Sequence, residues 1–173
     1  ADQYDEKKIW TNEEYPANFF RLKLVRKLLT DAGVKSLYEH GVGDATPLVT
    51  IAGDGIRVAG NDVSPEMVKF ARTNLINHGL DPGAVNLLDV QSQDAINAER
   101  ERAGEFDAVM ALGVIPHVED DRWFVASMDK FMAPGGRMLL QFRNSMFSMF
   151  TFNRLTKEFV QKVNSCRQQP KFL

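Results

Sequence analysis

Residues 34–46 read Val-Lys-Ser-Leu-Tyr-Glu-His-Gly-Val-Gly-Asp-Ala-Thr, and this stretch decides the expected fold. A short apolar run ends in an acid, two glycines follow with one residue between them, and a helix start comes next. A second β-like run, residues 56–61, ends beside another acid, Asp62. Because glycine lacks a Cβ, backbone at such a turn can approach a ligand closely. Two strands that end in acids around a glycine turn therefore predict a nucleotide-cofactor site.

Strand and helix patterns alternate along the rest of the chain. Cap-plus-proline pairs at Thr46-Pro47 and Ser64-Pro65 predict two helix starts. Such alternation predicts an α/β fold, a doubly wound and mainly parallel sheet with helices on both faces. Right-handed crossovers would place the glycine turn, Asp62, Asp89 and the pair Leu112-Gly113 at one carboxyl edge. The expected strands are residues 36–38, 56–61, 84–88, 106–112 and 137–142, and a tight turn at 134–136 precedes the last of them. Two later helices are expected at 92–102 and 119–132. The apolar face of the second helix carries Trp123, Phe124, Met128 and Phe131.

Three segments of one domain are expected. Residues 1–33 form an N-terminal helical segment, in which a capping box at 11–14 precedes an apolar stripe through Phe19, Leu22, Val25 and Leu29. Residues 34–142 form the α/β core. Residues 143–173 form an aromatic and basic helical segment without another clear strand, so the fold is expected either to be truncated at its C-terminus or to finish with helices.

Composition bounds the function without naming it. The chain has 173 residues, 21 basic against 23 acidic side chains and one cysteine, Cys166. A net charge of −2 gives no signal for nucleic acid or an anionic membrane. No apolar run approaches the roughly 20 residues of a membrane helix, and the charged N-terminus does not resemble a signal peptide. We therefore expect a soluble, cytoplasmic protein that binds neither nucleic acid nor membrane and has no metal cluster.

The turn favours one kind of nucleotide ligand over another. A dinucleotide turn would carry a third glycine, and Asp44 would put a negative charge where a pyrophosphate should sit. An adenosine that bears a cationic sulfonium tolerates nearby carboxylates better. Asp62 can accept two hydrogen bonds from ribose hydroxyls, although an Asx turn before Ser64 is the alternative. Asp89 could receive an adenine amine, although it could also be a solvated loop acid, and Asp94 competes for the role.

Four sequence blocks follow one another: Glu-His-Gly-Val-Gly-Asp-Ala at 39–45, Gly-Asn-Asp-Val-Ser-Pro-Glu-Met at 60–67, Phe-Asp-Ala-Val-Met-Ala-Leu-Gly-Val-Ile-Pro-His at 106–117 and Met-Ala-Pro-Gly-Gly-Arg at 132–137. In the order and spacing of these blocks, over about residues 34–142, the chain resembles the class I S-adenosylmethionine-dependent methyltransferases. It departs from them at Ala45, where the family usually has a third glycine, and in lacking the terminal strand hairpin.

The resemblance implies a cofactor, S-adenosylmethionine, and a role for each matching position. The methionine part of the cofactor would contact the glycine turn, at Glu39, Gly41, Val42 and Gly43, and the ribose would contact Asp62 at the end of the second strand. The adenine would contact the loops that follow the second and third strands, at Val63, Met67, Asp89 and Val90. The methyl group that is transferred would lie near the end of the fourth strand, at Leu112, Gly113 and Val114.

Other side chains are candidates for catalysis and for contacts with the acceptor. His117 follows the fourth strand and could act as general base for a hydroxyl, although a packing and capping role is the simpler reading. Trp10 and Tyr15 could form a lid, with Arg21 near a carboxylate of cofactor or substrate; alternatively Phe19 and Phe20 belong to a core face and Arg21 to its solvated side. Arg143 and Asn144, past the fifth strand, could meet an anionic substrate or lie in an exposed basic loop.

The sequence thus predicts an S-adenosylmethionine-dependent methyltransferase that acts on an oxygen or nitrogen of a small molecule. One alternative is a nicotinamide-dependent oxidoreductase, which the absent third glycine and the lack of a Tyr-x-x-x-Lys pair disfavour. Another is a non-catalytic nucleoside-binding domain that uses its aromatic tail for a partner. The sequence leaves the acceptor undetermined, and a homodimer stays open.

Overall fold

The computed structural model describes residues 16–88, 97 and 101–142, with side chains from residue 18 onward. The chain divides into two compact units, Ala1–Gln141 and Phe142–Leu173, and the description that follows concerns the first. The predicted capping box at 11–14, most of the predicted helix 92–102 and the segment 143–173 lie outside the described residues.

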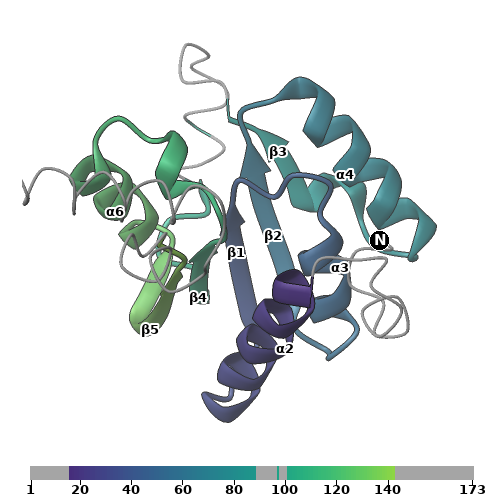
Figure 1. Cartoon of the computed structure of the whole chain (residues 1–173), viewed down its shortest axis with the longest axis horizontal. Coiled ribbons are helices and arrows are strands. Elements are labelled where there is room, and N and C mark those ends of the chain that lie inside the picture. The colour runs from purple at the N-terminus through teal and green to yellow at the C-terminus, as the bar shows by residue number, and fades with distance from the viewer. Residues whose placement is uncertain (1–15, 89–96, 98–100, 143–173) are drawn as a thin grey trace, which may run out of the picture. The chain divides into compact units, whose positions relative to one another are not determined.

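Five parallel strands form the sheet of the first unit (Figure 1). Its spatial order is β3-β2-β1-β4-β5, and every pairing is parallel. The strand order changes direction at β1, so the connections that follow β1 and β4 lead to opposite faces of the sheet, as at the switch point of nucleotide-binding sheets. This confirms the predicted fold class. The strands are β1 Ser36–His40, β2 Arg57–Asp62, β3 Val85–Leu87, β4 Phe106–Ala111 and β5 Met132–Leu140.

Helices cover both faces of this sheet, as predicted. On one face α2 (Pro16–Asp31), α3 (Thr46–Ala52) and α4 (Pro65–Asn77) pack in one apolar cluster with Leu37. On the other face α6 (Asp121–Asp129) packs with Tyr38. Neighbouring residues of β1 point to opposite faces because a strand has a period of two. Figure 1 shows α6 on one side of the sheet and α3 and α4 on the other.

The helix ends test the predicted caps. Ser64 is the N-cap of α4, and its hydroxyl accepts a hydrogen bond from the Met67 amide at 3.2 Å, as expected. The predicted cap at Thr46 is wrong by one residue. Ala45 holds the cap position with φ 60°, and the Asp44 carboxylate accepts from the Thr46 amide at 3.0 Å instead. An acid two residues before the amide replaces the hydroxyl as acceptor.

Three expectations about the core and the last strand are corrected. Trp123 is 60% exposed because Phe124 and Met128 fill the inward face of α6, and Phe20 is 54% exposed because Leu22, Val25 and Leu29 fill that of α2. The predicted tight turn at 134–136 lies inside β5, which already begins at Met132. There the pairing register shifts: Phe106 pairs with Met132 and Ala108 pairs with Arg137, so the segment 133–136 lies opposite Asp107 alone. Gly135 in this segment has φ 79°, so the chain bends there as predicted, but inside the strand rather than before it.

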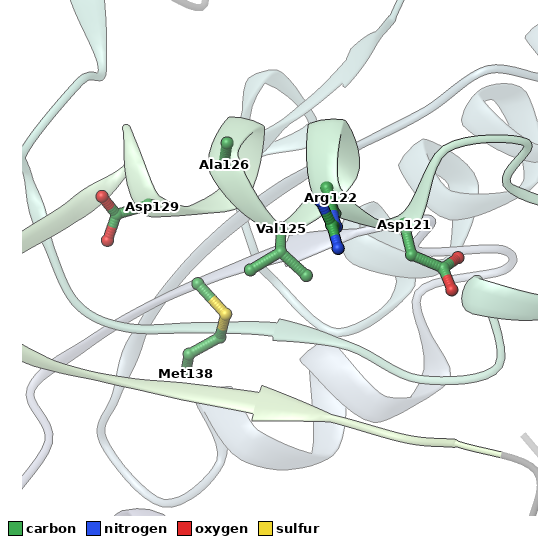
Figure 2. A pocket seen from close by; sticks show the side chains of 6 residues that line it. All are labelled: Asp121, Arg122, Val125, Ala126, Asp129 and Met138. Carbon is green, nitrogen blue, oxygen red and sulfur yellow. The ribbon is translucent and has the colours of Figure 1, made fainter.

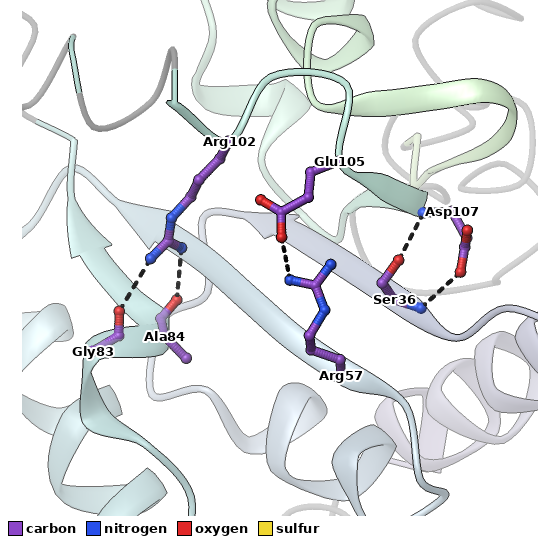
Figure 3. A network of polar contacts seen from close by, with 7 residues as sticks. All are labelled: Ser36, Arg57, Gly83, Ala84, Arg102, Glu105 and Asp107. Carbon is purple, nitrogen blue, oxygen red and sulfur yellow. Dashed lines mark hydrogen bonds and ion pairs between the residues drawn. The ribbon is translucent and has the colours of Figure 1, made fainter.

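A polar network ties the amino ends of the strands together (Figure 3). Asp107 on β4 accepts hydrogen bonds from the Lys35 and Ser36 amides at 2.9 and 3.0 Å, and the Ser36 hydroxyl accepts from the Asp107 amide at 3.0 Å. Arg57 and Glu105 form an ion pair beside it. These contacts fix β1 against β4 at the edge opposite the glycine turn. Within the described residues, no helix combines the length and apolar character that crossing a bilayer requires.

Candidate functional site at the carboxyl edge

The glycine turn grows directly out of the β1–β2 pairing. The amides of Gly41 and Val42 both donate to the Asn61 carbonyl, at 2.9 and 3.0 Å. Gly41 has φ 72° and Gly43 has φ 54°, a left-handed conformation that glycine adopts without a steric penalty. Ala45 shares that conformation with φ 60°, so the position where the third glycine was expected has the backbone shape of glycine but carries a methyl group.

Three glycines of the site differ in what a side chain would meet. A Cβ on Gly41 would lie 2.5 Å from Cγ2 of Val114, in the segment after β4. A Cβ on Gly60 would overlap the Glu39 carbonyl oxygen and the Val42 side chain. Among the residues described, nothing lies within 4 Å of a Cβ placed on Gly43. The protein itself therefore requires glycine at 41 and 60, whereas Gly43 faces open space that a ligand can use.

Asp62 joins the end of β2 to the turn. One carboxylate oxygen accepts from the Gly43 amide at 2.9 Å, and the other accepts from the Ser64 amide at 2.9 Å. The side chain is nearly buried, at 9% exposed. The Asx turn before Ser64, one of the two predicted readings, is therefore present. Each carboxylate oxygen has a second lone pair, so the predicted ribose contact remains compatible with these bonds and stays a prediction.

Glu39 is the most deeply buried acid of the edge. It is 1% exposed, and its Oε2 atom has no hydrogen-bond partner among the residues described. Burial raises the pKa of Glu39 well above its usual value; the Arg21 guanidinium opposes the rise, and the Asp44 and Asp62 carboxylates add to it. Burying a carboxylate whose Oε2 accepts no hydrogen bond is costly, so burial favours the neutral acid.

Two side chains of the site escaped the sequence reading. Gln141, just after β5, accepts a hydrogen bond from Nη1 of Arg21 at 2.8 Å, which ties α2 to the far end of the sheet. Asn74 on α4 donates from Nδ2 to the Asp44 carbonyl at 2.9 Å and so braces the turn from outside. Asn74 follows Ala71 by three positions on a helix whose inward residues are otherwise apolar, and that break in the stripe is the signal that could have identified it.

His40, the last residue of β1, also went unnoticed. It is 4% exposed and lies among aromatic rings, with centroids 5.0 Å from Tyr38, 4.9 Å from Phe131 and 5.9 Å from Phe124. Burial lowers the pKa of His40 to about 4, against a smaller opposing effect of a hydrogen bond with Asn61. Its neutral imidazole therefore packs against Phe124 of α6 at the end of β1, directly before the glycine turn.

The remaining predicted residues follow the ends of β2 and β4. Val63 is 70% exposed and Met67 is half-buried, so both offer apolar surface next to Asp62. Leu112, Gly113 and Val114 are half-buried after β4, and His117 is exposed on the short helix η3, Ile115–His117. The predicted contacts outside the described residues are Trp10, Tyr15, Asp89, Val90, Asp94, Arg143 and Asn144.

A cavity of about 500 Å³ lies elsewhere, between α6 and β5 (Figure 2). Val125 on α6 and Met138 on β5 point toward one another across it, and Asp121, Arg122 and Asp129 lie along its helical side. Of the predicted site residues that the structure describes, none lines this cavity. The polar contacts that converge on the glycine turn, rather than this cavity, define the candidate site.

Comparison with known proteins gives a consistent result. The family model described as a methyltransferase domain matches residues 38–140, more than half of the chain. The chain is 30% identical over 146 residues to a ubiquinone biosynthesis O-methyltransferase of Xanthomonas axonopodis pv. citri. The aligned region covers 84% of this chain and 58% of that relative. The chain thus spans less than two thirds of the curated relatives it matches.

Solved structures show the same fold at low sequence identity. An O-methyltransferase from Bacillus cereus in complex with SAH superposes with a TM-score of 0.57 at 16% identity, over 88% of this chain and 70% of that one. The cyclase SpnF superposes with a TM-score of 0.53 at 20% identity, over 67% of this chain and 43% of that one. Since a cyclase and a methyltransferase share it, the fold by itself does not determine the reaction.

Proposed function

Since this chain belongs to the methyltransferase domain family, we propose that it transfers a methyl group from S-adenosylmethionine to an oxygen or nitrogen of a small molecule. The observation that carries the proposal is the turn itself. In the described part of the chain, nothing lies within 4 Å of a Cβ on Gly43, and Oε2 of the buried acid Glu39, near the end of β1, has no hydrogen-bond partner.

The residues of the edge fit this cofactor. Its amino-acid ammonium would donate to Glu39, and its methionine part would run over the turn where a Cβ on Gly43 meets nothing. The ribose hydroxyls would donate to the remaining lone pairs of Asp62. The exposed Val63 and the half-buried Met67 offer apolar surface to an adenine ring. Acids around the turn suit a cation and would repel a pyrophosphate.

When bound, the cofactor supplies an electrophilic methyl group on a positively charged sulfur. The protein's task is then to align an acceptor with that methyl, because in-line positioning accounts for much of such a rate enhancement. The contact of Val114 with Gly41 sets the spacing between the turn and the segment after β4. The His117 amide donates to the Val114 carbonyl at 2.9 Å, which fixes the exposed histidine at this edge. Its imidazole would accept the proton of an acceptor hydroxyl.

The acceptor is proposed as a small hydroxyl compound first and an amine second. The curated relatives are named O-methyltransferases, which supports an oxygen acceptor. The net charge of −2 does not suit a polyanionic acceptor such as nucleic acid.

Calorimetric titration tests the cofactor directly. S-adenosylhomocysteine should bind with measurable heat, and NAD should not. Methyl transfer is then measured with S-adenosylmethionine labelled in the methyl group and a panel of phenols, alcohols and amines. Binding of NAD instead, or of neither nucleotide, would refute the proposal; binding of S-adenosylhomocysteine without transfer to any acceptor would leave a nucleoside-binding domain.

A matched pair of variants localises the binding. Gly43→Ala and Gly55→Ala both place a methyl at positive φ, 54° and 80°, where no atom of the described residues lies within 4 Å. The strain of each should be alike, about 1–2 kcal/mol of stability. Gly55 lies before β2, at the opposite edge, so only Gly43→Ala should weaken S-adenosylhomocysteine binding. Equal affinities in the two variants would move the ligand away from the turn.

A further inference from the structure

We propose that cofactor binding at the glycine turn is coupled to the release of one proton from the side chain of Glu39. The inference rests on the proposed function, because the ligand's ammonium group is what displaces the proton. It adds a pH dependence to that binding: the affinity should rise with pH.

The geometry around Glu39 favours a neutral acid in the free protein. Its side chain is 1% exposed, and Oε2 has no hydrogen-bond partner within the described ranges. Ionising a carboxyl group in such a place forfeits its hydration, and no hydrogen bond to Oε2 within the described residues replaces it. The direction of the Glu39 pKa, raised chiefly by burial, agrees with this.

The charged groups that face Glu39 come from three elements. Arg21 on α2 attracts the carboxylate form, whereas Asp44 in the turn and Asp62 at the end of β2 repel it. Nη1 of Arg21 already donates to Gln141 at 2.8 Å. Two carboxylates against one guanidinium leave the site short of positive charge, which is what an ammonium group supplies.

Ligand binding exchanges the proton of Glu39 for a hydrogen bond from the ligand. An N–H of the ligand ammonium donates to Glu39, the O–H bond of the carboxyl group breaks, and its proton leaves to solvent. The ligand remains an ammonium cation, and the protein gains one negative charge beside it. Because one proton is exchanged, the dissociation constant should fall by up to tenfold per pH unit while free Glu39 is protonated.

Calorimetry with S-adenosylhomocysteine in buffers of different ionisation enthalpy counts the protons. The wild-type protein should release close to one proton per ligand at pH values where free Glu39 is protonated, and fewer as the pH rises through the raised pKa of Glu39. Methylthioadenosine, which lacks the amino-acid group, should bind without releasing a proton. Observed heats that do not depend on the buffer at any pH would overturn the inference.

Variants assign the proton to one residue. Glu39→Gln should abolish proton release, whereas Glu101→Gln, which alters an exposed acid away from the edge, should leave it unchanged. Release that persists in Glu39→Gln would overturn the assignment. If Glu39→Gln proves too unstable to titrate, the carboxyl 13C shift of Glu39 in the wild-type protein should move from the protonated to the ionised range on ligand addition. An unchanged 13C shift on ligand addition would also overturn the inference.

The two proposals fail in different ways. Absence of any S-adenosylhomocysteine binding would remove the proposed function together with this inference. Normal binding with no proton release would remove only the inference and would leave the cofactor assignment intact.

Discussion

Replacing Gly41 by alanine tests whether the turn is held by contact with the segment after β4. The new Cβ would lie 2.5 Å from Cγ2 of Val114, whereas Cβ and Cγ1 of that residue would be at 3.7 and 3.8 Å, ordinary contact distances. The clash therefore comes from one methyl group. Valine is stiff at χ1, so it cannot turn that methyl away without strain.

The structure sets the expected magnitudes. A methyl at φ 72° costs about 1–2 kcal/mol in backbone strain, the same as at Gly43. The overlap with Val114 adds about 1–3 kcal/mol, the usual cost of overpacking. Gly41→Ala should thus lower the free energy of unfolding by roughly 2–5 kcal/mol, against a total of about 5–15 kcal/mol for a domain.

A double-mutant cycle separates the two contributions. Urea unfolding of Gly41→Ala, Val114→Ala and the double variant measures the coupling. Removing both γ carbons leaves the nearest Val114 atom at 3.7 Å, so the double variant should be more stable than the sum of the single effects by about 1–3 kcal/mol. Additivity within about 0.5 kcal/mol, or equal losses in Gly41→Ala and Gly43→Ala, would refute the contact.

Three further predictions concern neighbouring side chains. Asp62→Ala should lower stability by about 1–3 kcal/mol, because the Gly43 and Ser64 amides lose their acceptor, and should weaken S-adenosylhomocysteine binding; unchanged affinity by calorimetry would remove Asp62 from the site. His40 should make the protein less stable as the pH falls from about 6.5 to 4: its pKa is lowered to about 4 in the folded state, so the unfolded chain binds the proton first, at a cost of up to about 3 kcal/mol. Glu39, whose pKa is raised in the folded protein, has the opposite effect: its contribution to the free energy of unfolding is lost as the pH rises above its pKa in the unfolded chain. To remove this effect, the pH dependence of stability is compared between Glu39→Gln and the double variant Glu39→Gln, His40→Phe. Parallel urea midpoints of these two at every pH would contradict the assignment to His40. His117→Ala should reduce the rate of methyl transfer to hydroxyl acceptors with little change in cofactor affinity, and full activity would dismiss it as a base.

The fold followed from local patterns in the sequence. Alternating strand and helix signals predicted the parallel sheet, and the Ser64-Pro65 pair marked the start of α4, because a serine cap and a proline at the first turn are purely local requirements. The glycine turn was identified for the same reason: a positive φ at Gly41 and Gly43 is a property of the backbone there.

What the sequence did not reveal depends on tertiary contacts. Arg21 and Gln141 are 120 positions apart, and nothing in either local pattern links them. The exposure of Trp123 depends on Phe124 and its partners already filling the inner face of α6. Glycines at 135 and 136 indicate a bend in any context, and only the pairing of Met132 with Phe106 shows that β5 begins before this bend.

The most direct test of the account is a crystal structure of the protein with S-adenosylhomocysteine. We expect the homocysteine part of the ligand to lie over Gly43 with its ammonium group at Glu39, and the ribose hydroxyls of the adenosine part to lie at Asp62. A ligand bound at another edge of the sheet, or an empty carboxyl edge at saturating ligand, would contradict it.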